Sequence, residues 1–218
     1  MLKKAVVGVL VALTLVVGSG FADLGPGIVR AQQHTEITLK PVEQVRDYYI
    51  EYATQHGWEK LNDTMRQKAM AEVISEGPFV TTASRLYTPR VLWVERMANA
   101  DYYFRDFDQA EKEFYDDYYV DPADGIRIMT VLRDSNRRNL QDDSVEFIVR
   151  DSTGKVYRDW EVFTVPYPLT ERTTLGITLY NVTYELFVDG DFSEVDSIEL
   201  FVLVDGLVGR AEHRWILE

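Results

Sequence analysis

One segment of the chain, residues 101–119, combines aromatic and acidic side chains at high density. Its aromatic residues are Tyr102, Tyr103, Phe104, Phe107, Phe114, Tyr115, Tyr118 and Tyr119, and seven acidic residues are interspersed among them. Tyrosine offers an apolar ring together with a hydroxyl group, which suits contact with a sugar or a cationic partner. The candidate ligand-binding residues are therefore Tyr102, Tyr103, Tyr115 and Tyr119, with Trp160 as a further candidate in the second half of the chain. The alternative is an amphipathic helix whose aromatic side chains only pack onto the rest of the fold.

A second acidic segment, residues 185–205, contains seven acidic residues and no basic residue. Within it Asp189, Asp191, Glu194 and Asp196 form a loop of carboxylate oxygens, the ligand type that calcium prefers. Calcium is the one cofactor that the sequence suggests, with these four residues as its ligands. The spacing does not match an EF-hand, which needs Gly and Glu at the sixth and twelfth loop positions. The alternative is a solvated loop that holds no metal.

No catalytic motif is recognisable in the sequence. The three histidines, His34, His56 and His213, form no His-x-x-x-His pair, and the chain has no Gly-x-Ser-x-Gly motif or Gly-rich phosphate loop. His213 is in phase with Ala211 and Trp215, so we expect it to face inward as a core residue. Because carboxylates are abundant, a hydrolase that uses two of them stays open as a third class of function.

Composition narrows the function classes further. The 218 residues include 23 basic and 36 acidic side chains, a net charge of −13, and 46% are hydrophobic. That apolar content is too high for a disordered acidic chain, and the negative charge disfavours nucleic acid. The absence of cysteine excludes disulfides, thiolate metal sites and a cysteine nucleophile. Residues 101–120 and 185–205 hold most of the charge, so they would form one anionic surface if they adjoin in the fold.

Residues 1–22 have the pattern of an export signal. Lys3 and Lys4 precede an apolar run from Ala5 to Val17, and small residues follow up to Ala22. A spanning helix needs about 20 apolar residues, so the shorter run predicts cleavage after Ala22. A retained anchor is the alternative, and it is the only membrane contact that we expect. Export without cysteine fits a bacterium better than the eukaryotic secretory route, so the predicted location is periplasmic or extracellular.

A helical region is expected at residues 41–120, after a flexible leader at residues 23–40. Hydrophobic spacing predicts four helices, at about residues 41–57, 62–77, 88–98 and 108–118. Thr88 followed by Pro89 is expected to cap the third helix. Asp108 and Glu111, three residues apart, are expected to form a capping box for the fourth helix. The core stripe of the fourth helix is expected to be Ala110, Phe114 and Tyr118. Residues 79–87 fit either a strand or a loop.

Residues 121–218 alternate apolar and polar side chains as half-buried strands do. Six or seven short strands follow one another without an intervening helix, including a strand from Val156 to Phe163 and a final pair joined at Asp205-Gly206. This order predicts an α+β fold in which the helical region precedes an antiparallel β-sandwich, immunoglobulin-like in general pattern. The alternative is a single cone-shaped α+β domain whose helices cover one face of a curved sheet.

These observations predict a non-catalytic, exported envelope protein that acts as an interaction or structural module. Its expected partner is an envelope protein, a glycan or a cationic molecule. The alternative is a protein that binds a carbohydrate or another small ligand through the five aromatic candidates, assisted by calcium.

Overall fold

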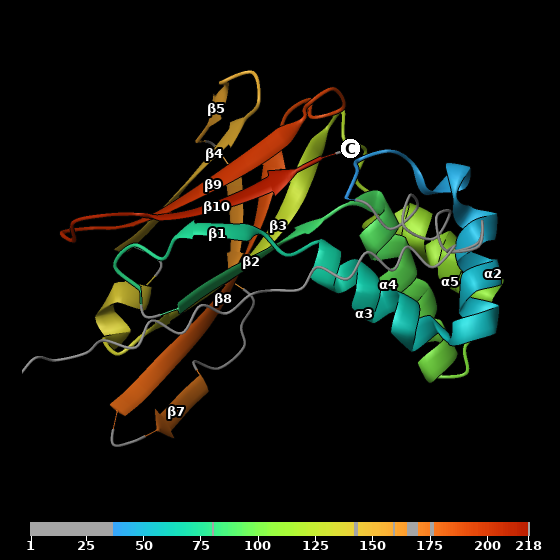
Figure 1. The fold of residues 1–218 in the computed structure, drawn as a ribbon, viewed down its shortest axis with the longest axis horizontal. Helices are drawn as coiled ribbons and strands as arrows, with labels where there is room; N and C mark the ends of the chain where they lie inside the picture. Colours follow the sequence, from blue (N-terminus) through green and yellow to red (C-terminus); the bar gives the residue numbers. More distant parts are fainter. Residues whose placement is uncertain are drawn as a thin grey trace, which may run out of the picture.

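The computed structural model describes residues 37–79, 81–141, 144–158, 160–164, 170–174 and 177–217. The expected export signal and most of the leader lie outside these residues. The described part contains four α-helices and two antiparallel sheets, so the predicted α+β class is confirmed. The helices lie at one end of the two sheets (Figure 1), which differs from the alternative in which they cover a face of one curved sheet.

The first two helices follow each other with a single residue between them. They are α2 (Arg46–His56), after a short 3-10 turn at Val42–Gln44, and α3 (Trp58–Lys68). Gly57 has a φ of +90°, a conformation that glycine adopts without strain, so the chain turns directly from one helix into the next. The second helix therefore begins before the predicted residue 62. It also ends earlier than the predicted residue 77, because Val73, which lies inside the predicted range, belongs to strand β1 (Glu72–Ser75).

The other two helices, α4 (Pro89–Tyr102) and α5 (Phe107–Glu113), are joined by a short turn. The Thr88 hydroxyl accepts a hydrogen bond from the Val91 amide at 3.3 Å, which confirms the predicted cap of α4. The predicted cap of α5 at Asp108 is wrong. Asp106 has the extended backbone of a capping residue, and its carboxylate accepts the hydrogen bond from the Gln109 amide at 2.8 Å.

A π turn at Phe114–Tyr118 continues α5 and changes which side chains face the core. The amide of Tyr119, the residue that follows the turn, donates to the carbonyl of Phe114 at 2.8 Å. This turn therefore contains one residue more than an α-helical turn. Ala110 and Phe114 are fully buried as predicted. Tyr118 is half-exposed, contrary to the prediction, and Tyr119 packs against the core in its place.

Two sheets make up the β part. In the first, the strand order is β2-β3-β8-β6, with β7 beside β8; the bounds are β2 (Thr81–Tyr87), β3 (Gly125–Asp134), β6 (Trp160–Thr164), β7 (Thr170–Thr174) and β8 (Ile177–Asp189). In the second, the order is β1-β10-β9-β4-β5; the bounds are β4 (Val145–Asp151), β5 (Val156–Tyr157), β9 (Ser197–Val204) and β10 (Ala211–Ile216). Another 3-10 turn, Arg137–Leu140, lies between β3 and β4.

Several strand predictions need correction. Strands β1 and β2 come from the segment expected to be helical. Of the two alternatives for residues 79–87, a strand or a loop, the structure supports the strand, which is β2. The expected single strand from Val156 to Phe163 is two strands in different sheets, β5 and β6. Asp205-Gly206 does turn the chain, since the Leu207 amide donates to the Val204 carbonyl at 3.1 Å. The connection nevertheless runs on to Arg210, because β10 begins only at Ala211.

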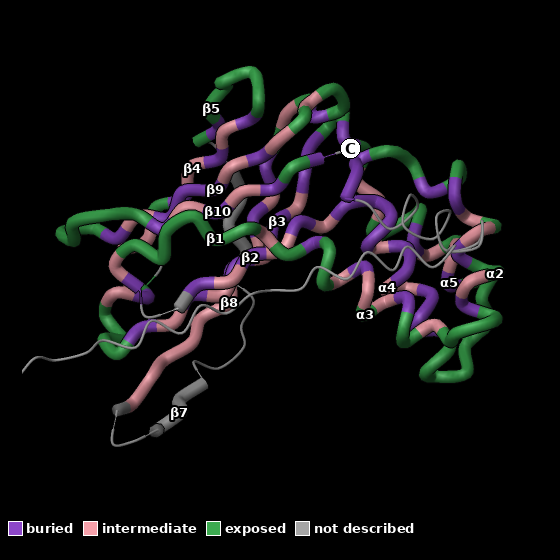
Figure 2. Tube along the Cα trace, viewed as in Figure 1, coloured by how far each residue is buried: buried purple, intermediate pink, exposed green. Residues whose placement is uncertain are grey.

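The two sheets face each other across a core that continues into the helices. Figure 2 shows buried stretches in strands of both sheets and along the helices. The rings of Phe147 on β4 and Tyr184 on β8 meet edge to face at 5.1 Å, and the indole of Trp215 on β10 donates to the Ala69 carbonyl at the end of α3 at 2.8 Å. His213 lies between the sheets and is completely buried, so its predicted inward orientation is confirmed.

Candidate functional site

The end of α4 and the turn that follows it expose three aromatic side chains in succession. Their exposed fractions are 74% for Tyr102, 67% for Tyr103 and 98% for Phe104, and the two tyrosine rings meet edge to face at 4.9 Å. We call these three residues the aromatic tip. The sequence predicted the two tyrosines as ligand-binding candidates. Phe104 was not selected, although a run of three aromatic residues between two helices was the available signal.

The backbone of Phe104 is strained. Its φ is +53°, and it is the one non-glycine residue of the described part with a positive φ. The Phe104 amide donates to the Asp101 carbonyl at 3.1 Å and the Arg105 amide to the Ala100 carbonyl at 2.8 Å, which is the helix-ending turn that normally has glycine at this position. An ordinary residue here costs about 1–2 kcal/mol. Because the ring is almost completely exposed, packing does not offset this cost, and such strain is a mark of functional positions.

The surroundings of the aromatic tip are negative. Asp101 and Asp106 are exposed and form no salt bridge within the described part of the chain. Arg105, the basic residue of this turn, donates through Nη2 to both carboxylate oxygens of Glu113, at 2.7 and 2.9 Å. Glu113 also pairs with Arg96, so these three side chains keep one net positive charge. Together with Asp101 and Asp106 they leave the turn with one net negative charge, and the tip presents its rings beside these two exposed carboxylates.

Tyr115 and Tyr119, the other two tyrosine candidates, lie together on the π turn with their rings 5.9 Å apart. The Tyr115 hydroxyl donates to the Glu43 carboxylate at 2.7 Å. Burial and this hydrogen bond raise the pKa of Tyr115, and burial with the nearby Asp121 raises the pKa of Tyr119. Both hydroxyls therefore stay protonated, and the Tyr115 hydrogen bond attaches the π turn to the first turn of the described chain.

Trp160, the fifth aromatic candidate, begins strand β6, where its backbone pairs with Val188 of β8. Its side chain lies outside the described part of the structure. The structure thus gives the tryptophan a position in the first sheet and leaves its predicted role open.

A groove of about 280 Å³ lies among the helices, between α2, α4 and α5. Residues from four helices line it: Arg46, Ile50 and Thr54 of α2, Trp58 of α3, Trp93 and Met97 of α4, and Phe107, Asp108 and Glu111 of α5. The lining residues of α2 and of α4 recur every four positions, which places them on one face of each helix. We call this the aromatic groove. None of the four candidate tyrosines lines it.

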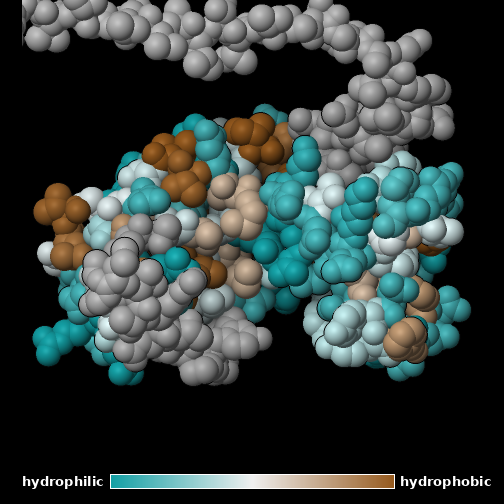
Figure 3. Space-filling model, turned by 60° about the horizontal axis from the view of Figure 1, so that its bottom comes forward, coloured by the Kyte–Doolittle hydropathy of each residue, from teal (hydrophilic) through white to brown (hydrophobic). Residues whose placement is uncertain are grey.

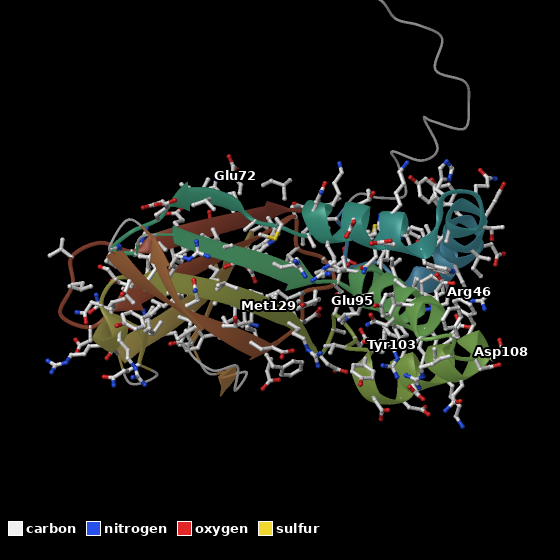
Figure 4. All side chains as sticks on the ribbon, turned by 90° about the horizontal axis from the view of Figure 1, so that it is seen from below. Arg46, Glu72, Glu95, Tyr103, Asp108 and Met129 are labelled. Carbon is white, nitrogen blue, oxygen red and sulfur yellow. The ribbon has the colours of Figure 1, made fainter. Side chains whose placement is uncertain are left out.

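The aromatic groove was not predicted from the sequence, because its walls are assembled from residues far apart in the chain. Figure 4 shows Arg46 and Asp108 at the end of the helices farthest from the sheets. The face drawn in Figure 3 is mostly hydrophilic over the helices, and hydrophobic residues gather over the β part. The available sequence signal was the four-residue spacing of Arg46, Ile50 and Thr54, and of Trp93 and Met97.

A network of charged hydrogen bonds holds one side of the aromatic groove. Arg46 donates through Nε and Nη2 to the two carboxylate oxygens of Glu111, at 2.6 and 2.7 Å, and the Trp93 indole donates to Oε1 at 3.1 Å. The Arg46 hydrogen bond is the main cause that lowers the pKa of the Glu111 carboxyl. Glu111 is therefore ionised and accepts hydrogen bonds from both Arg46 and Trp93. It joins α5 to α2 and α4 rather than serving as a proton acceptor.

The four residues predicted to bind calcium lie at the end of β8 and in the loop that follows it, and their predicted role stays open. Asp191 accepts hydrogen bonds from the amide and hydroxyl of Ser193, at 3.0 and 2.6 Å, and these bonds lower its pKa. Asp189 ends β8, while Glu194 and Asp196 line a hollow near the end of the chain. In the residues that the structure describes, no group of three or more acidic or histidine side chains is placed to hold a metal ion.

The two acidic segments approach each other in the fold. The amide of Gly190 donates to the Asp124 carbonyl at 3.0 Å, and the amide of Phe192 to the Pro122 carbonyl at 2.7 Å. The second acidic segment thus lies against the turn that directly follows the first one.

No protein-family model matches the chain, and no curated protein matches it either. Among the described helices, none has both the length and the apolar character that crossing a bilayer requires. What the protein does must therefore be inferred from its own residues.

Proposed function

We propose that the protein is a non-catalytic interaction module of the bacterial cell envelope that binds a basic protein partner through the aromatic tip. The observation that carries this proposal is the strained, exposed Phe104 beside two exposed tyrosines and two exposed aspartates that form no salt bridge with the described residues. Arginine side chains of a partner can stack on these rings and pair with the carboxylates at the same time. Three exposed aromatic side chains in one turn also provide the anchor type that dominates binding energies at interfaces.

We further propose that the β part is an immunoglobulin-like sandwich that carries the binding helices. The order β2-β3-β8-β6 in one sheet and β4-β9-β10 in the other supports this. If these strands are named A to G along the chain, the sheets contain A-B-E-D and C-F-G, the arrangement of that fold. In this description α4 and α5 are an insertion between strands A and B, so the aromatic tip projects from a connecting segment of the sandwich.

The proposed export can be tested at the N-terminal residues. Expression in a bacterium with an intact export pathway is expected to release a periplasmic protein that begins at Asp23, because the signal pattern places cleavage after Ala22. Intact-mass measurement of the purified protein checks this. The Ala22→Lys variant should accumulate as the uncleaved precursor, since the peptidase requires a small residue there. A full-length wild-type protein in the membrane fraction would contradict cleavage and favour the anchor.

Replacing Phe104 with glycine tests the aromatic tip. Glycine adopts the positive φ without strain, so the free energy of unfolding should rise by about 1 kcal/mol. Loss of the ring should weaken binding of a fluorescent arginine-rich peptide about fivefold, because a cation–π contact contributes about 1 kcal/mol. Urea unfolding measures the first effect and fluorescence anisotropy at low and high salt measures the second.

A matched control for this variant is Val208, an apolar side chain with 99% exposure in the connection between β9 and β10. Val208→Gly should bind the peptide as the wild type does, because it leaves the aromatic tip unchanged. Equal weakening by both variants would show only general attraction to an acidic protein. Unchanged affinity of Phe104→Gly would remove the aromatic tip from the proposed function.

A further inference from the structure

We infer that the aromatic groove is a second binding site, for a single neutral sugar ring. This inference does not depend on the proposed role of the aromatic tip, because the two sites share no residue. The volume of about 280 Å³ lies just below the range of ligand pockets, which begins at about 300 Å³. The groove therefore has room for one ring rather than for a chain of several.

The walls of the groove provide a stacking surface. The rings of Trp58 and Phe107 lie 5.6 Å apart with their planes tilted by 31°, and Trp58 meets the buried Trp93 edge to face at 5.8 Å. Phe107 and Ile50 remain 39% and 36% exposed, so apolar surface faces the solvent beside the groove. The face of an aromatic ring carries partial negative charge, and the weakly positive C–H groups on one face of a sugar ring complement it.

The rim of the groove offers two side chains, Asp108 and Thr54, that can accept hydrogen bonds. Asp108 is exposed and forms no salt bridge within the described residues, so its carboxylate is free to accept from hydroxyl groups. The Thr54 hydroxyl donates its hydrogen to the Ile50 carbonyl at 2.7 Å, which leaves its oxygen as an acceptor. A ligand with an apolar face and several hydroxyl donors on its edge matches this arrangement.

The charge of the groove selects against anions. Arg46 and Glu111 neutralise each other through their two hydrogen bonds. Asp108 then leaves the lining with one net negative charge. An acidic sugar would place a second carboxylate near Asp108 without a free cation to pair with it, and this repulsion is costly where water is partly excluded. A neutral hexose avoids that cost.

The groove is also held in shape before a ligand arrives. The Glu111 carboxylate joins α5 to Arg46 of α2 and to Trp93 of α4. These contacts fix the relative positions of the three helices that form the walls. Because a pre-formed site loses little conformational freedom on binding, even a small ring can bind with measurable affinity.

Calorimetric titration of the full chain tests this inference. The probes are methyl α-glucopyranoside, methyl α-galactopyranoside, N-acetylglucosamine and, as the anionic arm, glucuronate. We expect at least one neutral sugar to bind in the millimolar range and to change the tryptophan fluorescence, since Trp58 and Trp93 border the groove. Glucuronate should not bind. No heat from any neutral sugar at tens of millimolar would overturn the inference, and so would tighter binding of glucuronate.

Two variants locate the binding. Phe107→Ala removes one wall and should weaken sugar binding at least tenfold, and Asp108→Asn should weaken it severalfold while leaving the fold intact, because its side chain is exposed. Phe104→Gly is the matched aromatic control, since it alters the aromatic tip only and should bind sugar like the wild type. Wild-type sugar affinity in both groove variants would overturn the assignment. Loss of sugar binding in the groove variants with unchanged peptide binding separates this inference from the proposed function.

Discussion

Replacing Trp93 with alanine is expected to lower the free energy of unfolding by roughly 3–5 kcal/mol, the range for removing a large buried aromatic side chain. Trp93 is 1% exposed and packs against Tyr49 at 6.1 Å and Trp58 at 5.8 Å. Its indole also donates to the partly buried Glu111 carboxylate, so the variant leaves that oxygen with one partner fewer. Urea unfolding followed by far-ultraviolet circular dichroism measures the change.

The Trp93→Phe variant separates the two contributions. Phenylalanine keeps most of the buried ring and loses the indole N–H, so the expected loss falls to about 1–2 kcal/mol. A change smaller than 1 kcal/mol in Trp93→Ala would contradict a central role for this residue in the helical core. Unchanged stability in Trp93→Phe would mean that the hydrogen bond to Glu111 contributes nothing.

Local signals in the sequence were reliable where one or two neighbouring residues decide the structure. Thr88-Pro89 caps α4 and Gly57 ends α2, as predicted, because capping and positive φ depend on the residue itself. The alternation of apolar residues likewise located most of the strands after residue 125. These features follow from the chemistry of a short window of sequence.

Features that depend on distant partners were missed. Val73 fits a helical stripe, but its segment pairs with β10 at the other end of the chain and becomes strand β1. A short window cannot show this partner. The π turn is a similar case, since one additional residue moves Tyr119 into the position that the helical period assigns to Tyr118.

The two candidate sites show the same difference between local signals and contacts with distant residues. The aromatic tip was partly predicted because Tyr102 and Tyr103 are adjacent in the sequence. The aromatic groove needed the packing of α2 against α5, since Arg46 and Glu111 are 65 positions apart. Both sites lie on the helices outside the two sheets, so changes in binding can be examined without altering the strands.

Between the sheets, His213 belongs to a buried chain of hydrogen bonds that contains no carboxylate. Its Nε2 contacts the Thr82 hydroxyl at 2.8 Å and its Nδ1 the Ser84 hydroxyl at 2.5 Å, while Ser84 donates to Thr130 at 2.6 Å. Because Ser84 uses its hydrogen for Thr130, its oxygen accepts from Nδ1–H, and Nε2 accepts from Thr82. Both ring nitrogens of the neutral imidazole are thereby satisfied. Burial without a nearby anion lowers the pKa of His213 from 6.5 to about 4.

Stability is therefore expected to fall as the pH is lowered from 6.5 towards 4. In this window the unfolded chain binds a proton at His213 and the folded protein does not, so the contribution is complete above pH 6.5 and is lost on acidification. A change in pKa of this size corresponds to about 3 kcal/mol. The carboxyls of Glu111 and Glu199 have pKa values lowered from 4.5, so their effects are confined to more acidic solution. Urea unfolding at a series of pH values measures the loss.

The His213→Gln variant is the control, because it keeps a neutral hydrogen-bonding side chain. Its stability should stay constant between pH 6.5 and 4.5. A slope equal to that of the wild type would assign the pH dependence to other groups.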